Sequence, residues 1–278
     1  RDRLFSVCLK SKLWGFMKLI KELFKVYILF VTLFFIGRVF FYILYFDRLD
    51  DISISESLLS FVYGLRMDTI VISIILVIPT ILLTISPKFS SKYISKFLKF
   101  YILAFICIAL FIESASFPFF AEYDLRPNYL FIEYLEYPQE VTSLLFKDYK
   151  LEFIFASILI FIASKFYLNS NFIRFENIFE QNYISRFLLL LPILLVLFLG
   201  IRSSFGHRPV NISDALYSTN RVINEITKNS LHSLGYAYYS NKKSETDISK
   251  YGKMNIDDAY KYASKAIGVD FKDKNRPF

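Results

Sequence analysis

Five long apolar blocks constrain the fold of this 278-residue chain more than any other feature of its sequence. They cover about residues 24–46, 69–86, 97–117, 152–168 and 187–201. A helix that crosses the hydrocarbon core of a bilayer needs about 20 residues, range about 17–25. The fifth block is shorter than this, the fourth only just qualifies, and both can extend into their flanks. The sequence therefore predicts an all-α membrane protein whose transmembrane domain of five helices covers residues 24–201.

The distribution of charge predicts how these helices are oriented. Basic residues dominate residues 1–23, and Lys88, Lys92, Lys96 and Lys99 follow one another without an acid between them. The loops after the first and third blocks are rich in acids. Short cytoplasmic loops carry an excess of Lys and Arg, so residues 1–23 are predicted to be cytoplasmic and residues 202–278 extracytoplasmic. Residues 1–16 precede "MKLIKELFK", which reads as a natural start, and are interpreted as an extension that is not native.

The segment 202–278 is predicted to form a linker with surface helices. Apolar residues from Leu216 to Leu234 have the spacing of an amphipathic helix, which could lie along the membrane surface with Ser213 or Asp214 at its start. A polar linker is expected over residues 241–253 and a short helix over 255–269. In the acidic loop after the third block, one or two short helices are expected.

Composition and motifs exclude several classes of function. The net charge of +8 comes from bases beside apolar blocks, which is typical of orientation signals and not of a nucleic-acid surface, so no nucleic-acid partner is expected. Cys8 and Cys107 are interpreted as free thiols. The sequence contains no metal-ligand set, Gly-rich phosphate loop or nucleophile–base arrangement. No catalytic residue and no metal or other cofactor is assigned to this chain.

Four charged residues lie at membrane depth and are candidates for an intramembrane ion network. They are Arg38, Arg66, Asp68 and Glu113. A charge in the middle of a span costs several kcal/mol unless it is paired or reaches the interface. Either Arg38 or Arg66 could pair with Asp68 or Glu113. The alternative is that these long side chains extend separately to the two membrane surfaces.

A basic group follows the last apolar block and could contact a lipid headgroup. It consists of Arg202, His207 and Arg208, with Arg126 of the acidic loop as a further candidate. Arginine binds phosphate through two parallel hydrogen bonds, and lipid phosphates lie at this depth. The alternative is interfacial anchoring without a defined ligand.

Three stretches of the sequence resemble one family. They are "YGLRMDTIVIS", "YDLRPNYLFIEYLEYPQEV" and "HRPVNISDALYSTNRVINEITKNSLHSL". In these stretches the chain resembles the membrane half of the lipoteichoic-acid-synthase-like phosphoglycerol and phosphoethanolamine transferases, which belong to the sulfatase/alkaline-phosphatase-like superfamily. The similarity covers nearly everything from about residue 24. The positions that match, and that are candidates for supporting roles, include Arg66, Asp68, Arg126, Asn128, Arg208, Asn211, Asp214 and Asn220.

The resemblance implies a transferase of the bacterial plasma (inner) membrane whose extracytoplasmic (periplasmic) catalytic domain follows the linker. That domain would carry a Thr nucleophile activated by a divalent metal (manganese, magnesium or zinc). The chain ends near the point where such a domain should begin, so no catalytic residue is carried over.

The expected function is a membrane anchor that presents a donor lipid for transfer of phosphoglycerol or phosphoethanolamine to a glycan or lipid acceptor. Its expected partners are a membrane phospholipid and its own catalytic domain. A small transporter and a purely structural anchor are the alternatives.

Overall fold

The fold is described from a computed structural model, which defines the backbone of residues 2–49, 51–248 and 254–268 and the side chains of 17–49, 51–240 and 254–268. All secondary structure in these residues is helical. Five helices are long and apolar enough to cross a membrane, which confirms the prediction of an all-α membrane protein. The chain divides into two compact units, residues 1–237 and 238–278, and each is described by itself.

The first unit contains the five membrane-spanning segments. These are α1 (Asp2–Leu44), α2 (Ile54–Ile85), α3 (Ser91–Tyr123), α6 (Lys150–Asn169), and the pair α7 (Tyr183–Leu188) and α8 (Leu190–Arg202). Two short helices, α4 (Tyr129–Leu135) and α5 (Pro138–Lys147), lie between α3 and α6, as predicted for the acidic loop. Short 3-10 helices η1 (Phe46–Arg48), η2 (Lys88–Ser90) and η3 (Phe175–Glu180) lie in the other connections.

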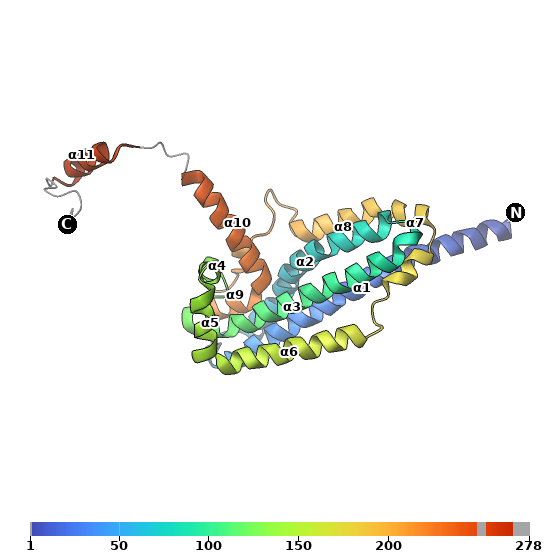
Figure 1. The fold of residues 1–278 in the computed structure, drawn as a ribbon, viewed down its shortest axis with the longest axis horizontal. Coiled ribbons are helices and arrows are strands. Elements are labelled where there is room, and N and C mark those ends of the chain that lie inside the picture. Colours follow the sequence, from blue (N-terminus) through green and yellow to red (C-terminus); the bar gives the residue numbers. More distant parts are fainter. Residues whose placement is uncertain (1, 50, 249–253, 269–278) are drawn as a thin grey trace. The chain divides into compact units, whose positions relative to one another are not determined.

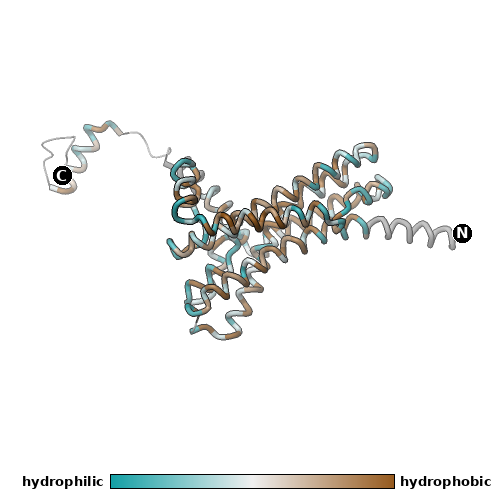
Figure 2. The backbone as a smooth tube through the Cα atoms, turned by 60° about the horizontal axis from the view of Figure 1, so that its bottom comes forward, coloured by the Kyte–Doolittle hydropathy of each residue, from teal (hydrophilic) through white to brown (hydrophobic). Residues whose placement is uncertain are grey.

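The long helices run up and down between two ends, named here the Met17 end and the Leu44 end after the two ends of the first span. α8 packs on α2, α2 packs on α1, and α6 packs on α3, so that α8 and α6 lie on opposite sides of the α1–α3 group (Figure 1). Hydrophobic turns run along these helices and hydrophilic segments gather at their ends (Figure 2). The core between α1, α2 and α3 includes Val26, Phe30, Phe34, Ile72, Ile75, Leu98 and Ile102.

α2 begins at Ile54, well before residue 69, where the second apolar block begins. The Ser53 hydroxyl accepts a hydrogen bond from the Glu56 N–H while the Glu56 carboxylate accepts one from the Ser53 N–H. This reciprocal cap is a strong start signal for a helix. The first half of α2 also buries Ser60 and Gly64 and packs on a later helix, α9. Tertiary packing therefore extends the helix through residues that are too polar to read as a span.

The predicted amphipathic surface helix after the fifth span is wrong. The chain instead forms η4 (Ile212–Ala215), α9 (Arg221–Thr227) and the start of α10 (Ser230–Ile248). Residues 222–227 of α9 are all buried, because α9 packs against α1 and α2. Its apolar side chains Val222, Ile223 and Ile226 join Phe41, Leu49 and Phe120 in a second core at the Leu44 end. This segment is therefore part of the bundle and does not lie flat on a lipid surface.

The second unit contains the end of α10 and α11 (Ile256–Ile267), whose N-terminus is capped by Asn255 through a hydrogen bond from the Asp257 N–H. The short helix expected over residues 255–269 is confirmed, although residue 269 lies outside the described residues. The polar linker expected over residues 241–253 is helical up to Ile248. Its remaining residues, 249–253, lie outside the described part of the chain, as do 269–278.

Candidate functional site

Arg38 and Asp68 form a buried ion pair between α1 and α2. Both terminal nitrogens of the Arg38 guanidinium donate to the Asp68 carboxylate, each at 2.9 Å, and the two side chains are 3% and 1% exposed. The Arg38 Nε donates to the carbonyl oxygen of Ile226 at 3.2 Å, and the Asn229 amide donates to Asp68 Oδ1 at 2.8 Å. The pair therefore holds α9 and the turn after it against the bundle.

A glycine makes room for this pair. A Cβ atom at Gly64 would overlap the guanidinium group of Arg38, so any other residue at this position would displace the arginine. Gly64 lies in α2 one turn before Asp68, on the face that meets α1. The same helix therefore supplies both the space for the Arg38 side chain and its counter-charge.

Glu113 and Arg126 form a second buried pair beside the first. Arg126 donates to Glu113 Oε2 at 2.8 Å and to the Ser230 hydroxyl, and its Nε donates to the carbonyl oxygen of Glu225 at 3.0 Å. The Glu225 carboxylate accepts the Arg126 backbone N–H at 2.9 Å, and the Ser230 N–H donates to Glu113 Oε1 at 3.3 Å. The guanidinium also lies 4.4 Å from the ring centre of Phe41, which attracts the cation.

The two pairs and their polar neighbours are called the ion cluster, which consists of Arg38, Asp68, Glu113, Arg126, Glu225, Asn229 and Ser230. Lys228 neutralises the remaining carboxylate, that of Glu225. Removing a charge from water costs several kcal/mol per ion, and attraction offsets this cost only when geometry is good and further hydrogen bonds are made. Each charge in the cluster has such bonds. With Lys228 counted, three cations face three carboxylates, and the network joins three spans to the chain after the fifth.

Of the four predicted intramembrane ions, the structure brings Arg38 and Asp68 together and gives Glu113 a different partner from those considered. Arg66 lies elsewhere: its guanidinium donates twice to the carbonyl oxygen of Ser203, at 2.9 and 2.6 Å. This ties the first half of α2 to the residue that follows α8. The alternative that Arg38 extends to a membrane surface is wrong, because its side chain is almost completely buried.

The prediction that Arg126 contacts a lipid headgroup is wrong. The Arg126 side chain is 2% exposed. Its guanidinium donates to the Glu113 carboxylate, the Glu225 carbonyl oxygen and the Ser230 hydroxyl. A buried carboxylate competes with any external phosphate for the same donors. Arg126 is therefore a member of the ion cluster, and it is not available to a headgroup at the surface.

The remaining headgroup candidates lie in the loop that follows α8. Arg202 donates to the carbonyl oxygens of Ser204, at 2.9 Å, and Gly206, so it folds this loop back on the end of its own helix. His207 and Arg208 are exposed. Their contact with lipid phosphate stays a prediction.

The other supporting positions suggested by the resemblance mainly fix local chain geometry. Asn128 accepts the Leu130 N–H at the start of α4, and Asn220 accepts the Val222 N–H at the start of α9. At η4 the Asn211 side chain accepts the Ser213 N–H and the Asp214 carboxylate accepts the Asn211 N–H, each at 2.8 Å. These residues therefore act as caps of the helices that carry the motif stretches.

Sequence reasoning missed Glu225, Asn229 and Ser230 as members of the cluster. A signal was present, because the polar run "NEITKNS" interrupts the apolar spacing of the predicted surface helix. Polar residues on the buried side of such a helix need buried partners. Arg38, Asp68 and Glu113 in the first three spans also need buried partners, so they are the expected partners of this polar run.

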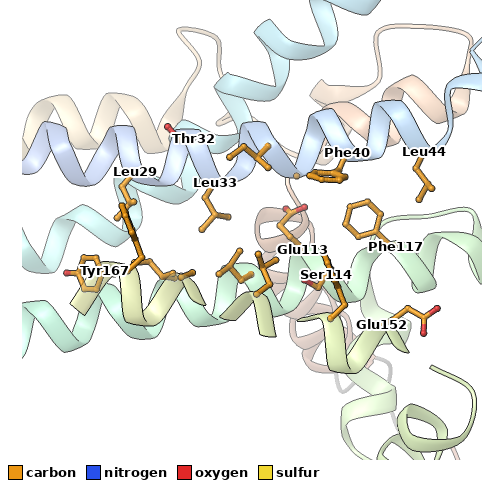
Figure 3. Close-up of a pocket in the computed structure, with 18 of the residues that line it drawn as sticks. Leu29, Thr32, Leu33, Phe40, Leu44, Glu113, Ser114, Phe117, Glu152 and Tyr167 are labelled. Carbon is orange, nitrogen blue, oxygen red and sulfur yellow. The ribbon is translucent and has the colours of Figure 1, made fainter. Parts of the chain in front are cut away.

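A large apolar cleft lies beside the ion cluster. Its volume is about 990 Å³, and α1, α3 and α6 supply most of its lining. α6 packs on α3, and α1 packs on α2 and α3, so α1 and α6 form two walls with α3 between them. Figure 3 shows Glu113 and Ser114 in the middle of the cleft, with Leu44 and Glu152 toward one end and Leu29 and Tyr167 toward the other.

Neither a protein-family model nor a solved structure matches this chain. Within the described residues, no group of three or more His, Cys, Asp or Glu side chains could hold a metal ion. The ion cluster contains three carboxylates, but cations of the protein already occupy them. The arrangement is therefore suited to holding segments together and to enclosing an apolar ligand.

Proposed function

We propose that this chain is the membrane-anchoring and lipid-donor-presenting module of a transferase. The transferase would move phosphoglycerol or phosphoethanolamine from a membrane lipid to an extracytoplasmic glycan or lipid acceptor. The observation that carries the proposal is the convergence of the three family-like stretches on the ion cluster. The first supplies Asp68, the second Arg126, and the third Glu225, Asn229 and Ser230.

This convergence supports a presenting role because it couples the bundle to the chain that leaves it. Residues 225–230 are held by Arg38, Asp68, Glu113 and Arg126 from four different parts of the sequence. The chain that follows residue 230 therefore leaves the bundle from a fixed point at the Leu44 end. A domain carried farther along the chain would stay tethered to a bundle that holds a lipid, which increases the chance of productive encounter.

The proposal assigns the chemistry to a catalytic domain outside this chain. A divalent metal, manganese, magnesium or zinc, would there lower the pKa of a Thr nucleophile and stabilise negative charge on phosphate. The partners proposed for the present chain are that domain and a membrane phospholipid. The residues of the ion cluster have a positioning role in this scheme, and no catalytic role.

The proposed location is the bacterial plasma membrane, with the Met17 end in the cytoplasm and the Leu44 end outside. Single cysteines at exposed positions test this orientation in a background without Cys8 and Cys107. A cysteine replacing Asp47 near the Leu44 end should react with an impermeant maleimide in intact cells. A cysteine replacing Lys92 should react only after lysis. The reverse pattern would refute the orientation.

The decisive test of the activity uses the complete gene product in proteoliposomes with a lipid labelled in its headgroup. Metal-dependent transfer of label to an acceptor is expected from the complete protein, and none from residues 1–278 alone. If the complete protein transfers no headgroup, the proposed function is wrong. Headgroup transfer by residues 1–278 alone would show that the chemistry has been assigned to the wrong part.

A further inference from the structure

Arg186 is a buried cation with no carboxylate beside it. It lies in α7 at the Met17 end of the bundle (Figure 1) and is 1% exposed. Its Nη1 atom donates to the carbonyl oxygen of Leu83 at 2.7 Å, and its buried Nε atom has no partner among the described residues. A guanidinium group carries five N–H donors. Arg186 therefore has a full positive charge and unused donors on the edge formed by Nε and Nη2.

Two other buried arginines show what such a group normally requires. Arg38 and Arg126 are almost completely buried, and each is paired with a carboxylate. Arg186 has weaker partners, because its guanidinium carbon lies 4.8 and 5.8 Å from the ring centres of Phe179 and Tyr183, which attract a cation. The end of α2, which supplies the carbonyl, carries only about half an elementary charge. Part of the positive charge is therefore left uncompensated.

The other charges at this end do not compensate for Arg186. Residues 87–99 carry four lysines and no acid. Glu22 and Glu180 already form ion pairs with lysines of α1. Glu176 is exposed and, within the part of the chain that the structure describes, forms no ion pair with Arg186. The electric field at this end therefore attracts an anion.

Further polar groups at the Met17 end also lack partners. The described residues include six buried side-chain atoms without a hydrogen-bond partner, and five of them belong to this end, on Thr80, Ser95, Gln181 and Arg186. Both polar atoms of the Gln181 amide are among the five. Water can satisfy hydroxyl and amide groups, but it cannot supply the negative charge that a buried guanidinium needs. An unpaired cation with free N–H donors has the chemistry of an oxyanion site.

The depth of Arg186 suits a phosphate group at the membrane surface. Arg186 follows Tyr183, the first residue of the fifth span, by three residues, or about 4.5 Å at the helical rise. Tyr183 is itself exposed, and exposed side chains change rotamer within nanoseconds, which opens this side of the guanidinium. Phe187 and Leu191 follow Tyr183 at intervals of four residues and are exposed. They offer an apolar face to the chains of a lipid whose phosphate reaches Arg186.

We propose that Arg186 binds a phosphate group at the Met17 end, either of a lipid in the leaflet at that end or of a soluble phosphate ion. The Nε and Nη2 atoms donate two parallel hydrogen bonds to it, as arginine commonly does to phosphate, while Nη1 keeps its bond to Leu83. The bound anion neutralises the guanidinium and stabilises the contact between α2 and α7. This site is at the opposite end of the bundle from the ion cluster and does not depend on the proposed transferase function.

The test removes phosphate from the sample and then returns it in matched forms. The purified chain is delipidated in dodecyl maltoside and Tris chloride, and thermal unfolding is followed by circular dichroism. Phosphatidic acid should raise the midpoint by several degrees more than diacylglycerol with the same acyl chains, because a ligand of the folded state stabilises it. Stabilisation by inorganic phosphate as well would identify a soluble ion as sufficient, whereas stabilisation by phosphatidic acid alone would identify a lipid. Equal effects of the two lipids with no effect of inorganic phosphate would overturn the inference.

A pair of arginine variants tests the location. Arg186→Gln should weaken the apparent affinity for phosphatidic acid by about 10- to 100-fold, the factor that corresponds to one charge-assisted hydrogen bond. Arg174→Gln removes an exposed arginine at the same end and should leave the affinity unchanged. Equal losses in the two variants would mean that phosphate is attracted by the general charge of this end, and the site at Arg186 would be wrong.

Arg186→Met separates a ligand site from a purely structural arginine. Without phosphate the wild type buries an unpaired cation, and methionine fills much of the same space without a charge. The variant should therefore unfold at the same temperature as the wild type or a higher one in the phosphate-free sample, and phosphatidic acid should stabilise it no more than diacylglycerol does. If Arg186→Met is less stable than the wild type there, or does not fold, contacts within the chain already compensate for the charge and the inference is wrong.

Discussion

Replacing Arg38 with methionine removes one half of a buried ion pair, and the structure indicates how much this should cost. Asp68 loses two charge-assisted hydrogen bonds of 2.9 Å and keeps only the one from Asn229. Each such bond contributes about 1.5–3 kcal/mol, and breaking one side of a buried pair costs about 3–5 kcal/mol. We expect Arg38→Met to lower the free energy of unfolding by about 4 kcal/mol.

The double variant Arg38→Met/Asp68→Leu separates the cost of an unpaired charge from the value of the pair itself. Replacing both ions by apolar groups of similar volume is often neutral, although here the Asn229 amide loses its acceptor, which costs about 1–3 kcal/mol. The double variant should therefore be more stable than either single variant. The assay is SDS-induced unfolding in bicelles, followed by circular dichroism.

The control is Arg48→Met, which breaks the exposed pair between Arg48 and Asp124. Those side chains are 46% and 35% exposed, and exposed pairs contribute about 0–1 kcal/mol. If the costs of Arg38→Met and Asp68→Leu simply add in the double variant, within about 0.5 kcal/mol, the two side chains do not act as a pair. In that case the reasoning about the ion cluster would be refuted.

Three further predictions use the same assay. Gly64→Ala should destabilise by about 1–3 kcal/mol, because its Cβ meets the Arg38 guanidinium; a neutral result would contradict the close approach. Asn220→Ala removes the cap of α9 and should cost about 1 kcal/mol, whereas Asn220→Ser should largely restore stability. Burial lowers the pKa of His232, so its contribution to stability is complete above the usual pKa of about 6.5 and is lost as the pH falls below it. His232→Gln should flatten the pH profile between pH 7 and pH 5, and an unchanged slope would assign the dependence to other groups.

The spans could be predicted from the sequence because hydropathy is a local property. Each of the five apolar blocks corresponds to one membrane-spanning segment. The predicted bounds are less accurate where packing extends a helix. α2, for example, begins at Ile54 after the Ser53 cap and buries Ser60 and Gly64 before the apolar block begins. Such a segment has a polar sequence like that of a loop, although packing buries part of it.

The partners of the buried charges could not be predicted, because they depend on contacts between distant residues. Position in the spans identified Arg38, Asp68 and Glu113 as charges that need partners. The choice of partner depends on α9, which returns to the bundle more than 180 residues after Arg38. Periodicity suggested a single surface helix there, and it contained no information on the break at Lys228 and Asn229 that turns Ser230 toward Glu113.

The long separation within the ion cluster has a consequence for biogenesis. Arg38 and Asp68 are 30 residues apart, so they can enter the membrane as one neutral hairpin during synthesis. Asn229 follows Asp68 by 161 residues, a distance that a ribosome covers in roughly 8–30 s at about 5–20 residues per second. During this interval Glu113 has Arg126 as its early partner, only 13 residues later. The order of the charges along the chain therefore lets each arginine of the ion cluster meet a carboxylate soon after synthesis, and the last segment adds hydrogen bonds to two ion pairs that have already formed.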